Sequence, residues 1–298
     1  MLIDRLNPVQ WEWMVYLEMF VAGIAAGAYM VAAMLEWSGR GTSAVARAGH
    51  ALAFPLVAIA ALLLTFDLDR PERFWHMTVQ SKTMLPMFKY WSPMSVGAQA
   101  LVFFGGLTFV SFVDFLIGRG LFHLGGWRAE RTLHGSALGR VWALLGLVLG
   151  TVMAAYSGVL LSSTNIPGWA DSTLIGALFV ATSIVTGTAA LILLQTLRGL
   201  ADEDLSALAQ TNTWLIAWWL LLVVVFLASL GEGARFLLAG TALVALIGAI
   251  LLGGVVPLAL RFAARARAAS MQPLSAALVL IGGFLLRYAI VVGPQNLR

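Results

Sequence analysis

Cysteine is absent from the 298-residue sequence. This absence excludes disulfide bonds, cysteine-ligated iron–sulfur clusters and cysteine-ligated zinc from the chain. Charged residues are also scarce, at 11% of the chain, whereas soluble domains contain about a quarter. Together with 60% hydrophobic residues, these shortages exclude an ordinary soluble domain and predict an all-α integral membrane protein.

Long apolar runs predict eight transmembrane helices, because about 20 apolar residues are needed to cross a bilayer. We expect a single membrane domain over 1–298, made of two four-helix bundles over 1–165 and 166–298. Before the sixth span, RGLADEDLSALAQTN predicts a short amphipathic helix of its own. The expected spans lie near 13–35, 48–66, 93–117, 138–162, 173–196, 212–231, 235–260 and 274–292.

The positions of the basic residues predict the orientation. An even number of spans leaves both termini on one side of the membrane. That side carries eight Lys and Arg residues, Arg287 among them, against ten on the other side. Because cytoplasmic loops carry the excess of Lys and Arg, we expect a multi-pass protein of a bacterial or archaeal inner membrane with both termini extracytoplasmic. Loop arginines of this kind contact membrane lipid and indicate no nucleic-acid partner.

The four histidines argue against a buried cofactor. They lie in predicted loops or at the edge of a span, at His50, His76, His123 and His134. Haem ligated by two histidines needs them on facing helices inside the membrane. We therefore expect no haem and no metal in this chain.

The first span, Trp13 to Leu35, carries the main candidate residue. Gly23 and Gly27 form a G-x-x-x-G pattern that allows another helix to approach closely. Glu18 lies near the start of this span, where an ionised carboxylate costs about 3 kcal/mol on insertion scales. Such a residue needs a reason, either a function or a hydrogen bond within the helix bundle.

Tyr156 in the fourth span is expected at a similar depth to Glu18, measured from the side of the termini. A phenol and a carboxyl in an apolar bundle suit a quinone head group, because quinone carbonyls need donors and quinol oxidation needs a proton acceptor. Simple packing of Tyr156 is an equally open interpretation.

The loop from Asp67 to Trp91 is rich in aromatic residues and methionine. Such residues mark either the headgroup region of the bilayer or a surface that docks a partner protein. The residues that we consider for docking are Arg73, Phe74, Trp75 and His76.

Several motifs resemble the NrfD family of polysulfide reductase-type membrane subunits. They are YLEMFVAGIAAGAYM in the first span, DLDRPERFWHM after the second, SPMS before the third, YSGVLLS in the fourth and LIGGFLLRYAIVVG in the eighth. The resemblance extends over nearly the whole chain. It implies eight helices in two bundles, no haem, and a site for menaquinone or ubiquinone near the extracytoplasmic face.

The resemblance also implies partners and site residues. The partners would be an extrinsic four-cluster iron–sulfur subunit and a molybdopterin oxidoreductase catalytic subunit. Tyr156 matches the quinone-binding tyrosine, and Glu18 stands where the family has a quinone-binding histidine. Val15 stands where the family has an asparagine, so we assign Val15 no role at the quinone. The loop motif is matched by Asp67, Asp69, Arg70 and Arg73, of which Asp67 and Arg70 are expected at the quinone.

These observations predict a quinone-reactive subunit of a respiratory oxidoreductase, in which Glu18 and Tyr156 are the catalytic residues. One alternative is a proton-translocating subunit with a path through Glu36, Asp114 and the polar patch Thr182, Ser183, Thr186 and Thr188. The sequence also leaves open a passive membrane anchor and a small-molecule transporter. A transporter would need interrupted helices at mid-membrane. The only prolines that we place inside the membrane, Pro55 and Pro257, lie near span ends, which argues against it.

Overall fold

The computed structural model describes residues 11–121, 133–199, 203–263 and 268–295. Within these residues, eight helical segments are long and apolar enough to cross a membrane, as the hydropathy predicts. The first six spans are the single helices α1 to α6. The seventh span is divided between α7 and α8, and the eighth is α9. Their bounds are α1 Trp13–Trp37, α2 Ala44–Phe66, α3 Pro93–Gly118, α4 Ala137–Ser162, α5 Ile175–Leu197, α6 Glu203–Ser229, α7 Gly240–Ile250, α8 Val256–Ala263 and α9 Ala268–Val292.

Three helices begin at a serine that caps the helix. The side chains of Ser43, Ser92 and Ser136 accept hydrogen bonds from backbone N–H groups in the first turns of α2, α3 and α4. This arrangement satisfies donors that a helix cannot pair internally. Pro93 follows Ser92 and needs no donor at that position, which explains why the SPMS motif starts the third span.

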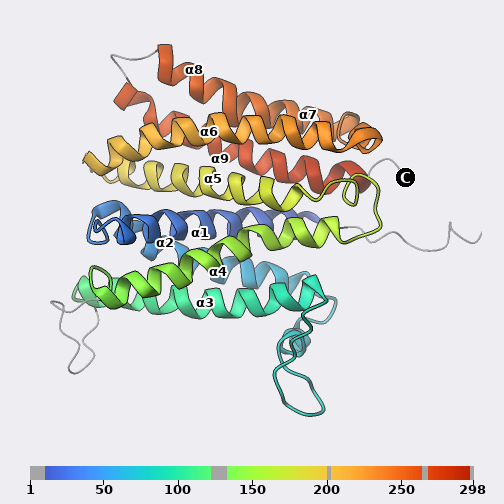
Figure 1. Ribbon diagram of the computed structural model, residues 1–298, viewed down its shortest axis with the longest axis horizontal. Coiled ribbons are helices and arrows are strands. Elements are labelled where there is room, and N and C mark those ends of the chain that lie inside the picture. Colours follow the sequence, from blue (N-terminus) through green and yellow to red (C-terminus); the bar gives the residue numbers. More distant parts are fainter. Residues whose placement is uncertain (1–10, 122–132, 200–202, 264–267, 296–298) are drawn as a thin grey trace, which may run out of the picture.

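The helices run roughly along one axis, with α1–α4 in one half of the molecule and α5–α9 in the other (Figure 1). α1 lies at the centre, where it packs against α2, α4, α5 and α9. Within an 18-residue hydrophobic stretch of α1, 78% of the residues are buried, the largest share among the corresponding stretches of the eight spans. The proposed division at residue 165 stays a prediction, because α1 and α4 both pack against α5 across it.

Glycines explain how α1 and α5 come together. A side chain at Gly27 would collide with the backbone of Ser183, and one at Gly187 would collide with the backbone of Gly27 and Ala28. Gly23 likewise faces Ser183 and Arg287. The G-x-x-x-G pattern of the first span is therefore a helix-packing surface, as predicted.

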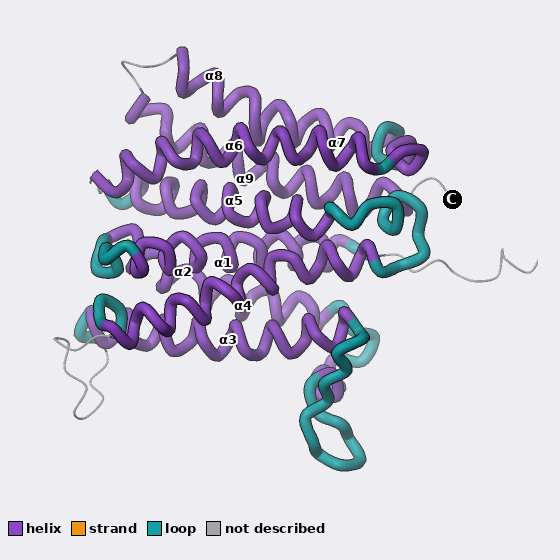
Figure 2. Tube along the Cα trace, in the orientation of Figure 1, coloured by secondary structure: helices purple, strands orange, loops and turns teal. Residues whose placement is uncertain are grey.

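The chain ends of the bundle lie together. The backbone N–H of Trp11 donates to Gln295 Oε1 at 2.7 Å, so the start of α1 and the end of α9 share one end of the molecule. We call this the terminal end and its opposite the far end. The loop from Asp67 to Trp91 projects from the terminal end, beside α3 (Figure 2), and contains a short 3₁₀ helix over Pro71–Met77.

Two spans differ from the expected pattern. The predicted amphipathic helix before the sixth span is not separate: α6 starts at Glu203 and runs without a break to Ser229. The seventh span is interrupted by a π-helical turn over Leu251–Val255. Pro257 lacks the N–H that would bond the carbonyl of Gly253, which accounts for the irregular turn.

Candidate functional site at the terminal end

Glu18 is buried in the interior of the protein, with 2% of its surface exposed. It lies five residues into α1, about 7.5 Å along the helix from its start. Its Oε1 atom has no hydrogen-bond partner among the described residues. Since buried polar atoms are nearly always paired, this oxygen marks a place where a ligand, a water molecule or a proton completes the site.

Tyr156 comes from α4 and is half-buried. It lies six residues before the end of its helix, about 9 Å in depth. Its ring lies directly against Gly97 of α3, where a Cβ atom would overlap the ring carbons. The expected similarity in depth of Glu18 and Tyr156 is thus observed, and Gly97 holds the tyrosine ring between α3 and α4.

Arg287 is a third residue at this depth. In the comparison of basic residues on the two sides of the membrane, we counted it as a loop residue. It is 1% exposed and lies inside α9, about 7.5 Å before its end. Its Nη2 atom donates to Ser183 Oγ at 2.9 Å, and the guanidinium lies 4.4 Å from the centre of the Phe179 ring. It lies beside Gly23 of the helix that carries Glu18, and its Nη1 has no hydrogen-bond partner among the residues that the structure describes.

The burial of Arg287 could have been recognised from the sequence LLRYAIVV, because an arginine within an apolar span is a functional signal. The burial of Arg287 also changes the number of Lys and Arg residues that are compared between the two sides of the membrane. Without Arg287, the terminal side carries seven loop Lys and Arg residues instead of eight, against ten on the other side. The correction strengthens the asymmetry from which the orientation was predicted.

Similarity to known proteins identifies the family. The family described as Polysulphide reductase, NrfD matches residues 2–297. The chain belongs to the NrfD family. The C chain of polysulfide reductase from Wolinella succinogenes is 27% identical to it over 193 residues, which make up 62% of this chain and 58% of that relative. The matched region therefore covers little more than half the length of the relative.

In this NrfD protein the projecting loop is fixed to the third span. The Gln99 side chain of α3 donates to the carbonyls of Thr78 and Met87, both at 3.1 Å. Ser95 Oγ accepts from the backbone N–H of Lys89 at 3.0 Å. The loop is thus held at two places while its apolar side chains stay exposed. The exposed large ones are Phe74, Trp75, Met84, Leu85, Phe88, Tyr90 and Trp91.

The loop residues that were predicted to line the quinone site lie on the outside. Asp67, Asp69 and Arg70 are exposed. Arg73 pairs weakly with its neighbour Glu72, at 4.0 Å on an exposed surface. The rings of Trp75 and His76 contact each other, with centroids 3.9 Å apart.

Glu36 and Asp114, the predicted proton-path residues, lie at the far end of the NrfD fold. Asp114 accepts backbone hydrogen bonds from Leu133 at 2.7 Å and His134 at 3.3 Å. Glu36 Oε1 accepts from the N–H of Gly135 at 2.6 Å. The two carboxylates therefore anchor the chain just before α4, a structural role that was not predicted.

Two histidines are more deeply buried than their positions in the sequence indicate. His134 lies in the segment before α4, as expected, but His50 lies six residues inside α2 and not at its edge. Both are buried, with 1% of His50 and 7% of His134 exposed. Position along the chain does not decide burial here, because α1–α4 close around this end. His76 stays in the projecting loop, and His123 lies outside the described residues.

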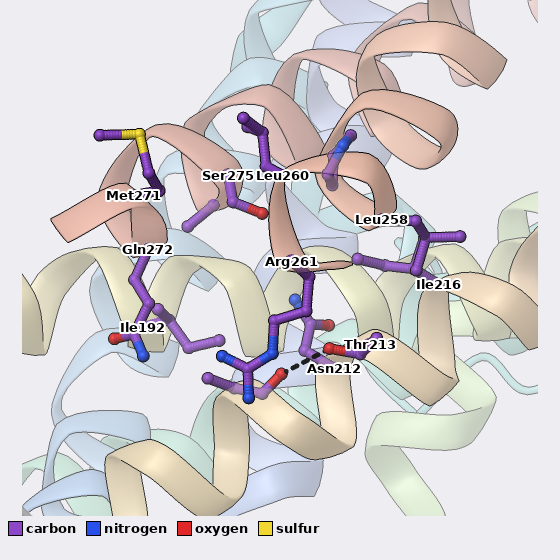
Figure 3. Close-up of a pocket in the computed structure, with 13 residues that line it drawn as sticks. Ile192, Asn212, Thr213, Ile216, Leu258, Leu260, Arg261, Met271, Gln272 and Ser275 are labelled. Atoms are coloured by element: carbon purple, nitrogen blue, oxygen red, sulfur yellow. Dashed lines mark hydrogen bonds between the residues drawn. The ribbon is translucent and has the colours of Figure 1, made fainter. Parts of the chain in front are cut away.

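Two cavities of the NrfD protein open at the far end. One lies between α5, α6, α8 and α9, where the Arg261 side chain extends from α8 towards the helix that carries Asn212 and Thr213 (Figure 3). The other, of about 320 Å³, is lined by residues of α2, α3 and the segment before α4, including His50, Asp114 and His134. Neither cavity is lined by Glu18 or Tyr156.

Proposed function

We propose that this NrfD protein is the quinone-reactive membrane subunit of a respiratory oxidoreductase complex. The observation that carries the proposal is the buried Oε1 of Glu18, without a hydrogen-bond partner among the described residues, at a depth similar to those of Tyr156 and Arg287. Membership of the NrfD family and likeness to a protein named as part of polysulfide reductase support it.

The three side chains provide the groups that a quinone head group requires. Tyr156 O–H and Arg287 Nη1 donate hydrogen bonds to carbonyl oxygens, and Glu18 exchanges protons with the hydroxyl oxygens of a quinol. Bound menaquinone or ubiquinone supplies two-electron, two-proton redox chemistry. The positive charge of Arg287 keeps Glu18 from being an isolated buried anion, whose free-energy cost would be high.

Electrons must leave the chain through a partner, since it has no cysteine to hold a cluster. We infer that the exposed apolar loop docks an extrinsic iron–sulfur subunit, with a molybdopterin oxidoreductase beyond it. The loop suits this task because several aromatic residues are exposed on one anchored segment, and aromatic residues are enriched in protein interfaces. It lies at the same end as Glu18, which keeps the electron-transfer distance short.

The test measures quinone binding and quinol-dependent reduction of the partner's clusters in the purified complex. We compare wild type with Glu18→Gln and Tyr156→Phe, which remove a proton acceptor and a hydrogen-bond donor with little change in shape. Glu232→Gln and Tyr16→Phe are matched controls: Glu232 is exposed at the terminal end, and the Tyr16 ring packs against Tyr288 and Phe284.

We expect Glu18→Gln to slow electron transfer by about 10²–10⁴-fold, the usual contribution of general acid–base catalysis, and to change the pH profile. We expect Tyr156→Phe to weaken quinone binding, while both controls behave as wild type. If both site variants bind and oxidise quinol as wild type does, the protein is a passive anchor or the site lies elsewhere.

Proton translocation across the membrane is the alternative function. It needs a polar route from Glu18 to the far end. At intermediate depth, Tyr29 O–H pairs with Ser111 at 2.9 Å, and Trp142 donates to the same hydroxyl at 3.1 Å. In the predicted patch, Thr182 and Thr186 donate to carbonyls of their own helix. Both oxygens of Asp114 already accept backbone N–H groups, so the geometry favours the quinone site as the primary function.

A further inference from the structure

The far end of the first four helices brings together side chains that no part of the quinone chemistry uses. Glu36 comes from the end of α1, His50 from the first turns of α2, and His134 from the segment just before α4. One ligand atom from each of the three lies within 4.8 Å of the others. His134 Nδ1 is 3.5 Å from Glu36 Oε2. Two imidazoles and a carboxylate form a ligand set that divalent transition metals prefer.

The cluster contains lone pairs that the described residues leave without partners. Neither ring nitrogen of His50 has a hydrogen-bond partner in this part of the chain, and the same is true of Glu36 Oε2. The other Glu36 oxygen is held by the N–H of Gly135. A buried polar group without a partner is costly, so a ligand that accepts these lone pairs would stabilise the folded protein.

Space for an ion lies beside the cluster. His50 and His134 both line the cavity of about 320 Å³, together with Asp114. Their rings are stacked, with centroids 3.6 Å apart and planes at 15°. Stacked rings hold their lone pairs parallel, so a shared ion requires one imidazole to rotate about its Cβ–Cγ bond, into the adjacent cavity. A tetrahedral site then leaves one position for water.

The charges around the cavity suit a divalent cation. Glu36 and Asp114 are buried, at 2% and 4% exposure, and each brings one negative charge. Arg47 and Arg119 also line the cavity, but both are exposed and lie at its solvent side. Asp114 accepts the backbone N–H of His134 at 3.3 Å, so it fixes the main chain that carries this ligand.

We propose that Glu36, His50 and His134 bind one divalent transition-metal ion of the Zn²⁺ class at the end opposite the quinone site. The ion ties α1, α2 and the start of α4 together, and so fastens the first four helices at the end away from the projecting loop. This site is independent of the proposed quinone chemistry, and its test does not measure quinone turnover.

The test uses the full chain purified in detergent without its partners, stripped with a chelator and titrated with Co²⁺ and then Zn²⁺. Co²⁺ reports its ligands by visible absorption. We expect one equivalent per protein with a tetrahedral spectrum. His50→Gln should weaken binding at least tenfold, whereas the control His76→Gln should bind as wild type because His76 lies in the projecting loop. Binding should weaken as the pH falls, because protons compete for imidazole.

His50→Cys gives a direct assignment. The protein has no other cysteine, so a thiolate-to-Co²⁺ charge-transfer band in this variant comes only from position 50. Circular dichroism of each variant establishes that it is folded. The proposal is overturned if folded wild type takes up no more metal than folded His50→Gln, or if His50→Cys binds Co²⁺ without the charge-transfer band.

Discussion

At the scale of single residues, we expect Glu18 and Arg287, which are both buried, to act as a pair of opposite charges. Removing one partner of such a pair leaves the other charge uncompensated, which typically costs about 3–5 kcal/mol. We expect Arg287→Met alone to destabilise the protein strongly. The double variant Glu18→Gln with Arg287→Met should be more stable than Arg287→Met, because no charge is left behind.

Thermal unfolding of the four proteins of this cycle in detergent measures the coupling. A coupling of at least about 1 kcal/mol is expected for residues in one network. Additive effects of the two substitutions would contradict the pairing of Glu18 with Arg287.

Asp67 is a residue outside the membrane spans whose titration affects stability. Partial burial raises the pKa of Asp67 above its usual range, and the carboxylates of Glu12 and Asp69 raise it further. The folded state therefore holds this proton more tightly than the unfolded chain. The resulting stabilisation is present at low pH and is lost as the pH rises through the folded-state pKa.

We expect Asp67→Asn to stabilise the protein near neutral pH by removing this repulsion. The gain should be on the order of 0.5 kcal/mol or less, since exposed charges are screened, and should vanish below the ordinary carboxyl pKa of about 4. Unfolding midpoints across this pH range measure it, with Glu232→Gln as control. A gain that persists unchanged in acid would have another cause.

At the scale of the helices, the packing of α3 against α4 sets the position of Tyr156. Gly97 faces the Tyr156 ring, whereas a side chain at Gly106 of the same helix would meet no atom within 4 Å. We expect Gly97→Ala to displace the ring and to weaken quinone binding about tenfold in a folded protein. Gly106→Ala should leave binding unchanged. Equal binding by both variants would mean that Tyr156 is not held by this contact.

The glycine contact between α1 and α5 shows how a short sequence pattern sets the arrangement of a larger structure. Gly27 and Gly187 allow the two helix backbones to touch, and this brings Ser183 beside Arg287. Both α1 and α5 also pack against α9, whose Arg287 lies beside Gly23 of α1. A site built from three helices thus depends on two residues without side chains.

At the scale of the whole molecule, we expect the terminal end to be extracytoplasmic. The sequence has no native cysteine, so single cysteines report the sides of the membrane without background. Thr83→Cys, in the projecting loop, should react with a membrane-impermeant maleimide in intact cells. Ser38→Cys, exposed at the far end, should react only after the membrane is opened. The reverse labelling pattern would invert the orientation.

Composition and hydropathy determined the class of the protein and its eight spans. These properties follow from the apolar composition of each segment, and the bilayer imposes the helix because backbone groups in lipid must bond internally. Local patterns also determined the serine caps and the close-packing face of the first span. Glu18 could be recognised because a carboxylate inside an apolar span is costly wherever the helices lie.

Only the tertiary structure decided which residues meet. It brought Arg287 to α1, the helix that carries Glu18, and it buried His50 and His134 beside Glu36 at the far end. Sequence distance gives no measure of such contacts, because they depend on how separate helices pack around α1. The sequence also did not reveal that Asp114 and Glu36 anchor backbone N–H groups, since those groups become neighbours only when α1, α3 and the start of α4 close together.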